Sequence, residues 1–110
     1  METHAYKWQA RVAKALAHPT RIAILEMLRR GGICVCEMSP VLEASQANVS
    51  QHLAILRDNN LVTTRREGTR MVYGVTDERV FQVLDLIGSI AHDQLDAARQ
   101  ALAALETVAA

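Results

Sequence analysis

Residues 45–57 have the sequence SQANVSQHLAILR, and they carry the clearest indication of the fold. Ser45 is a good helix N-cap, because its side-chain oxygen can accept a hydrogen bond from an amide of the first turn. Val49, Leu53 and Leu56 recur at helical spacing and form one apolar stripe. We therefore predict a helix that begins after Ser45 and packs on a core along this stripe.

The opposite face of this predicted helix is polar but almost uncharged, whereas an ordinary solvated face would hold Lys and Glu. Glutamine can pair with adenine, serine can bond to base edges or phosphate, and alanine can touch a thymine methyl group. We predict that this face enters the DNA major groove, with candidate contacts Gln46, Ala47, Asn48, Ser50, Gln51 and His52. The alternative is a plain polar surface. For His52, beside the core stripe, we favour a half-buried position over a phosphate contact.

Three further helices are predicted before this stretch. Helical spacing of apolar residues indicates the first over residues 2–17, and Pro19, at the first-turn position that proline favours, begins a second that ends at Gly31-Gly32. A short third helix covers residues 36–43, and Pro40 leaves its start open because proline cannot donate a backbone hydrogen bond. This short helix and the one after Ser45 make a helix-turn-helix.

A β-hairpin is predicted next, with strands over 61–66 and 69–75 and Glu67-Gly68 at the turn. Its tip carries three arginines, Arg65, Arg66 and Arg70, against one acid. Such a patch can neutralise DNA phosphates beside a helix in the groove. We predict that the hairpin is a DNA-binding wing, and the alternative is a charged turn of the kind found on any soluble protein.

From Asp77 the pattern is helical again, and apolar residues spaced by threes and fours continue to Leu105. One face is apolar for about nine turns if this helix runs to the end, although the alanine-rich tail after Gln100 looks loose. One small domain cannot cover such a stripe. We expect a two-fold homodimer through the first and last helices, reading symmetric half-sites of DNA. The candidate interface residues are Trp8, Val12, Leu84, Ile87, Ala91 and Leu95.

The predicted fold is therefore mainly α with a β-hairpin wing, a winged helix-turn-helix, as one domain over residues 1–110. The length of 110 residues and the 50% hydrophobic content suit one domain with a modest core. The net charge of zero argues against a protein that coats nucleic acid by bulk electrostatics. No apolar run approaches the roughly 18 residues that span a bilayer, and the start of the chain is polar. We expect a cytoplasmic protein with no membrane partner.

Cys34 and Cys36 are the only two cysteines of the chain. Cytoplasmic cysteines are mostly reduced, so we expect thiols and not a structural disulfide, and a metal or redox role. Residues i and i+2 of a helix point about 200° apart, so both sulfurs can bind one ion only where the entrance to the short helix is non-helical or distorted. A ligand that needs both would then work against regular helix. The alternative without a ligand is that each cysteine is a small buried apolar residue.

Four motifs together resemble the ArsR/SmtB metal-responsive repressors: AHPTRI at 17–22, CVCEM at 34–38, SQANVSQHL at 45–53 and REGTR at 66–70. The resemblance covers about residues 10–95. It implies an apo dimer that binds an operator in its own promoter and is released by its ligand. The Cys-Val-Cys motif followed by an acid resembles the branch that senses arsenite, antimonite, cadmium or lead.

The chain departs from that family's patterns in two places. Arsenite sensors of this branch often carry a third cysteine where Ser39 stands, and cadmium and lead sensors add cysteines from an N-terminal arm that here offers only His4. Another branch binds zinc, cobalt or nickel between the last helices through an Asp-x-His motif, but Asp77 is followed by Arg79. His92 and Asp96, one turn apart, are the alternative metal site.

The leading hypothesis is a homodimeric repressor of double-stranded operator DNA that is released when Cys34 and Cys36 bind a thiophilic ion. Trivalent arsenic or antimony is the first choice, and cadmium or lead the second, with a small thiol, water or the other chain supplying the missing ligand. The alternatives are a redox-sensing repressor and a repressor with silent cysteines. An enzyme using Cys36 with His52 or His4 lacks an evident oxyanion site, so we predict no enzymatic activity.

Overall fold

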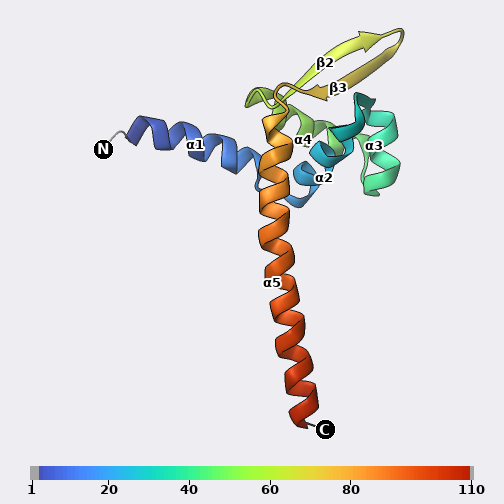
Figure 1. The fold of residues 1–110 in the computed structure, drawn as a ribbon. Helices are drawn as coiled ribbons and strands as arrows, with labels where there is room; N and C mark the ends of the chain where they lie inside the picture. Colours follow the sequence, from blue (N-terminus) through green and yellow to red (C-terminus); the bar gives the residue numbers. More distant parts are fainter. Residues whose placement is uncertain (1–2, 110) are drawn as a thin grey trace.

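The structure is a computed structural model that describes residues 3–109. Its helices are α1 (Thr3–Leu16), α2 (Pro19–Met27), the 3-10 turn η1 (Leu28–Arg30), α3 (Val35–Leu42), α4 (Gln46–Asp58) and α5 (Arg79–Ala109), and its strands are β1 (Ile33–Cys34), β2 (Val62–Glu67) and β3 (Arg70–Val75). Helices α2, α3 and α4 gather in one body, from which the β2–β3 hairpin, α1 and α5 project in different directions (Figure 1). The predicted helices and hairpin wing are confirmed.

The core lies where α2, α3 and α4 meet, and the stripe predicted on residues 45–57 is its centre. Val49, Leu53 and Leu56 are fully buried, together with Met38 of α3 and Leu25 of α2. Burial of side chains of this size contributes about 1.5–3 kcal/mol each. Ser45 is the N-cap of α4, as predicted, and its Oγ accepts a hydrogen bond from the Asn48 amide at 3.1 Å.

A third strand, β1, was not predicted. The sheet has the order β1-β3-β2 and is antiparallel throughout, with Ile33 opposite Tyr73 and Cys34 opposite Val72. A strand of two residues is too short to show an alternating pattern in the sequence. Gly32 permits its close approach, because a Cβ there would lie 2.5 Å from a methyl group of Val72.

Helix α3 begins one residue earlier than predicted, at Val35, and Pro40 lies inside it. Proline has no amide to donate to the carbonyl four residues back, so α3 is kept helical by its packing on the body. The helix ends at Leu42, and its C-cap Glu43 is left-handed, with a φ of 52°. In the wing, the turn consists of Gly68 (φ +63°) and Thr69, one residue later than the predicted Glu67-Gly68.

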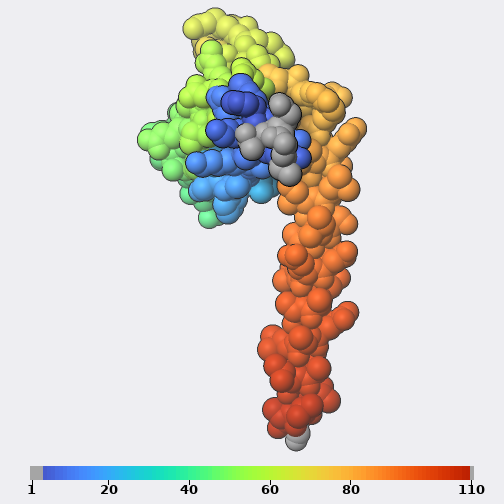
Figure 2. Space-filling view, turned by 90° about the vertical axis from the view of Figure 1, so that its left-hand side faces the viewer, coloured from blue at the N-terminus to red at the C-terminus, as the bar shows by residue number. Residues whose placement is uncertain are grey.

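The expectation of a loose tail after Gln100 is wrong, because α5 continues as a helix to Ala109. Alanine and leucine are strong helix formers and dominate residues 101–109. The 31 residues of α5 correspond to about 46 Å of helix. Figure 2 shows its greater part as a rod that stands clear of the body. Within residues 3–109, no helix is long and apolar enough to cross a membrane.

Candidate functional site

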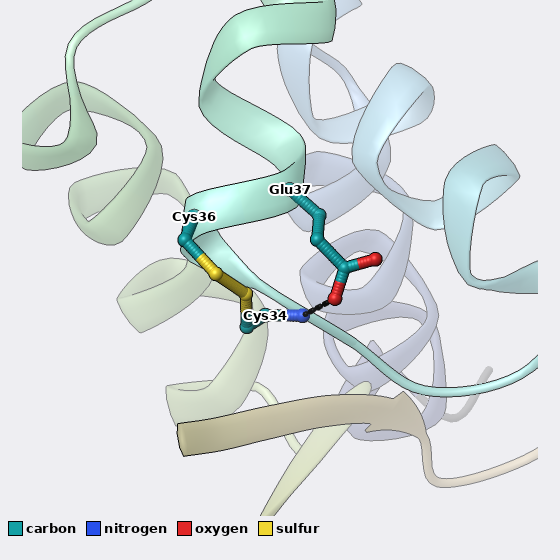
Figure 3. A group of neighbouring side chains, drawn as sticks. All are labelled: Cys34, Cys36 and Glu37. Atoms are coloured by element: carbon teal, nitrogen blue, oxygen red, sulfur yellow. Dashed lines mark hydrogen bonds between the residues drawn. A yellow bond between two sulfur atoms is a disulfide. The ribbon is translucent and has the colours of Figure 1, made fainter. Parts of the chain in front are cut away.

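The two cysteines lie at the junction of β1 and α3. Cys34 is the extended N-cap of α3, with φ −93° and ψ 164°, and Cys36 is in its first turn. Their Cα atoms are 5.2 Å apart, a separation that suits a disulfide, and the structure joins the two sulfurs in one (Figure 3). The non-helical entrance is thus confirmed, whereas the expectation of unpaired thiols is not met. The sulfurs meet without any unwinding of α3, so a ligand need not work against regular helix.

Glu37 is a third candidate ligand beside the sulfurs, and sequence reasoning missed it. Its Oε1 accepts a hydrogen bond from the Cys34 amide at 3.4 Å (Figure 3). The ligating atoms of Cys34, Cys36 and Glu37 lie within 4.8 Å of one another, and no other trio of His, Cys, Asp or Glu in the described part of the chain does so. Ser39 does not join them, because its hydroxyl donates to the Ala44 carbonyl. Cys34 is buried, whereas Cys36 and Glu37 are exposed, so an ion would enter from the Cys36 side.

A shallow pocket of about 240 Å³ lies between the cysteines and the wing. It is lined by Cys34, Val35, Cys36, Thr69, Arg70, Met71 and Tyr73. Arg70 of β3 reaches across it: its Nη2 lies 3.4 Å from Cys34 Sγ, and it forms an ion pair with Glu37. The thiol site is therefore shared between α3 and the wing.

The wing arginines do not form the single patch that the sequence predicts. Arg65 pairs with Glu67 at 2.8 Å, and Arg70 is turned to Glu37. Arg66 is exposed and makes no ion pair within the described residues. All three side chains are nevertheless on the surface of the hairpin, where they can contact phosphates.

The candidate DNA-reading face of α4 is open to solvent. Gln46, Ala47, Asn48, Ser50 and Gln51 are all exposed. His52 is half-buried, its ring centroid is 4.3 Å from that of His18, and Arg21 Nη1 lies 3.3 Å from its Nδ1. Burial, with the neighbouring His18 and Arg21, lowers the pKa of His52. These contacts lock α4 to α2 and account for His52 as a packing residue.

The candidate dimer residues separate into two groups. Trp8, Val12, Ile87, Ala91 and Leu95 are exposed, whereas Leu84 is only 4% exposed and lies in the core of its own chain. A groove of about 580 Å³ runs between α1, α2 and α5, and its lining is nearly all apolar. Val12 and Ile87 are part of it.

The alternative sites are less complete. His92 Nε2 lies 3.4 Å from Asp96 Oδ2, and both side chains are largely exposed. The carboxylate of Asp77 is bound by Arg79, which lowers its pKa to about 2. The structure pairs Cys36 with Cys34, and it places His52 against His18 and Arg21.

Comparisons with known proteins agree on the kind of protein. Residues 18–64 match the pattern described as bacterial regulatory protein, arsR family. The arsenical resistance operon repressor of Staphylococcus xylosus is 35% identical over 88 residues, which cover 77% of this chain and 85% of that protein. A homologue of the cadmium resistance transcriptional regulatory protein CadC, from Staphylococcus aureus, is 36% identical over 77 residues, which cover 69% of this chain and 64% of that protein. The homodimeric winged helix-turn-helix DNA-binding domain of Mb0332 from Mycobacterium bovis superposes with a TM-score of 0.77 at 31% identity, covering 87% of this chain and 89% of that one.

Proposed function

The chain belongs to the arsR family of bacterial regulatory proteins, and from this premise we propose that it is a homodimeric repressor released from operator DNA by a thiophilic ion at Cys34 and Cys36. Trivalent arsenic or antimony is the favoured inducer, with cadmium or lead second. The observation that carries the proposal is the meeting of two sulfurs and the Glu37 carboxylate where α3 touches the wing. Relatives named as arsenical and cadmium resistance regulators support it.

The donor set suits such an ion. Soft thiolates select soft ions, and only the reduced, deprotonated sulfur is a ligand. The disulfide must therefore be reduced to two thiols before an ion binds, by two molecules of a cellular thiol that are themselves joined in a disulfide. Cys34 and Cys36 would hold the ion, and Glu37 would supply an oxygen as the third ligand, in competition with water or a small thiol.

The ion acts on DNA binding through linkage. The site is built on α3, which packs on the DNA-reading helix α4, and on β1, which pairs with the wing strand β3. An ion that fits the DNA-free arrangement of these elements better lowers DNA affinity. A coupling free energy of about 1–3 kcal/mol corresponds to roughly 5- to 150-fold.

The proposed partners are double-stranded operator DNA and a second copy of the chain. The exposed face of α4 would read bases, and Arg65 and Arg66 of the wing would lie over phosphates, whereas Arg70 is turned to Glu37. Trp8, Val12, Ile87, Ala91 and Leu95 would meet the partner chain, and Leu84 would support them from the core. Such a repressor works in the cytoplasm, where the operator is, and needs no enzymatic activity.

A redox-sensing repressor is the second candidate, and the disulfide of the structure favours it. Two thiols and one peroxide molecule would give the disulfide and two molecules of water. The two cysteines are separated by one residue and their Cα atoms are 5.2 Å apart, so the bond can form without a rearrangement of the fold. The oxidised and reduced forms would then differ in operator affinity.

The test is release from the DNA upstream of the protein's own gene, measured with reduced protein under anaerobic conditions. Arsenite, antimonite, cadmium, lead, zinc and peroxide are titrated against wild type, Cys34→Ser and Cys36→Ser, with Ser39→Ala as a control that alters the same helix outside the ligand set. Either cysteine change should abolish release by thiophilic ions and leave apo affinity within about threefold, less than about 1 kcal/mol.

Two results would redirect the proposal. If both serine variants are still released at the wild-type ion concentration, the thiols are packing residues and the site must be sought at His92 and Asp96. A peroxide response that persists after removal of all metal, and is lost in both variants, would establish the redox mechanism instead.

A further inference from the structure

Arg70 is a wing residue whose side chain contacts the thiol site. It is the first residue of β3, beside the hairpin turn. Glu67, its partner in the strand register, is engaged by Arg65, and the guanidinium of Arg70 contacts Cys34 Sγ and the Glu37 carboxylate. Both of these partners belong to the candidate ligand trio.

The strand register makes this contact a short link between the wing and α3. Cys34 is opposite Val72, which is two residues along β3 from Arg70. Side chains two residues apart on a strand point to the same face. Arg70 therefore stands over the cysteine end of α3 by virtue of the sheet, and its ion pair with Glu37 ties the outer end of the wing to that helix.

A bound ion would compete with Arg70 for the same atoms. The ion takes lone pairs of Cys34 sulfur and of the Glu37 carboxylate, which are the acceptors that Arg70 uses. A guanidinium keeps its charge at any physiological pH and has no lone pair available, so it cannot itself become a ligand of the ion. Ion binding at this site therefore opposes the Arg70 contacts.

We propose that Arg70 is the positioning residue that ties the wing to α3 in the DNA-binding state and is expelled when an ion occupies the cysteines. This inference rests on the proposed function and assigns the route by which that site regulates DNA binding. Loss of the tie lets α3, which packs on α4, move relative to the wing, so that α4 no longer fits the groove while Arg65 and Arg66 stay over phosphates. If Arg70 instead contacted a DNA phosphate after its release, the ion would raise the operator affinity. The proposal requires that the ion lowers it.

The first experiment compares Arg70→Gln with Arg66→Gln, a change on the same hairpin that lies outside the thiol site. The operator dissociation constant of each reduced, full-length variant is measured without ion and with saturating arsenite, and with cadmium in parallel. The side chains of Arg70 and Glu37 are 52% and 48% exposed, so their pair is worth about fivefold at most. We expect the dissociation constant with ion, divided by the constant without ion, to be three- to fivefold smaller in Arg70→Gln than in wild type. Arg66→Gln should weaken both constants equally and leave the ratio unchanged.

The second experiment needs no ion. Operator affinity of ion-free protein is measured for Arg70→Gln, Glu37→Gln and the double variant. The double variant should bind no more weakly than Arg70→Gln alone, because either change already breaks the tie. Hydrogen exchange at the Cys34 and Val72 amides should rise in each variant and be unchanged in Arg66→Gln.

Either of two results would overturn the role of Arg70. One is that Arg70→Gln weakens operator binding equally without and with ion, so that the ratio is unchanged. Arg70 would then be an ordinary phosphate contact. The other is a double variant whose loss equals the product of the two single losses. Failure of the proposed function looks different: wild type itself would then show no release by arsenite or cadmium, and the ion-free double variant would still decide whether the tie exists.

Discussion

Helices α4 and α5 are both amphipathic, but only α4 is complete within one chain. The apolar residues Val49, Leu53 and Leu56 of α4 are fully buried, and its other side is polar. In α5 only Val80 and Leu84 are buried, while Leu95 is 48% and Leu105 67% exposed. The contrast indicates that the open face of α4 suits a polar partner and the open face of α5 an apolar one.

The reason is the length of α5. About 46 Å of helix carry its apolar residues, and the body of the chain covers only the beginning. Exposed apolar surface of this extent marks an interaction site. The apolar groove between α1, α2 and α5 is continuous with it through Ile87, and supports the proposal that a second copy covers both.

The largest expected effect is at Leu95. Leu95→Asp should place an unpaired charge in the stripe that we propose a second copy covers, weaken the dimer by several kcal/mol and abolish operator binding. Sedimentation and operator titration at several protein concentrations measure it.

The matched control is Ser89→Asp, which puts the same charge on the opposite side of α5. It should leave assembly and binding close to wild type. A Leu95→Asp protein that is well folded and still dimeric would place the interface elsewhere and break the contrast between the two helices. A wild type that is monomeric at all concentrations would do the same.

A smaller effect is expected on the open face of α4. Gln51→Ala should cost about 1–3 kcal/mol on the correct operator and much less on random DNA, because it would remove the hydrogen-bonding base contact that we propose for Gln51. Gln82→Ala removes the same side chain from an exposed position of α5 and should change neither affinity. Equal losses of Gln51→Ala on operator and random DNA would show that Gln51 positions the helix without reading sequence.

The smallest effect concerns the buried edge of α4, at His52. Its pKa in the folded state is lowered below the usual 6.5, chiefly by burial. The unfolded chain therefore takes up a proton at a higher pH than the folded one, and stability falls as the pH decreases below about 6.5 until the folded-state pKa is passed. The free energy of unfolding is measured with urea at several values between about pH 8 and about pH 5. Between these limits it should decrease less in His52→Gln than in wild type. Parallel pH profiles for the two proteins would show that the His18 and Arg21 contacts do not hold His52 neutral.

The sequence by itself determined the elements whose signals are local. Helical spacing located the stripe Val49, Leu53 and Leu56, Ser45 marked the start of α4, and Gly68 marked the wing turn. The proximity of Cys34 to Cys36 also follows from the sequence. These features depend on residues within a few positions of one another, so no knowledge of the rest of the fold is needed. The largest local error was the tail after Gln100, where the alanine-rich composition was taken as loose although alanine favours helix.

Only the tertiary structure decided which distant residues meet. The pairing of β1 with β3, the contact of Arg70 with Cys34 and Glu37, and the tilted ring contact of His52 with His18 each join segments more than 30 residues apart. It also placed Leu84 in the core and left Leu95 exposed, although both lie on one stripe of the same helix. Periodicity fixes the face of a helix on which a residue lies, whereas burial depends on how far the packed body extends along that face.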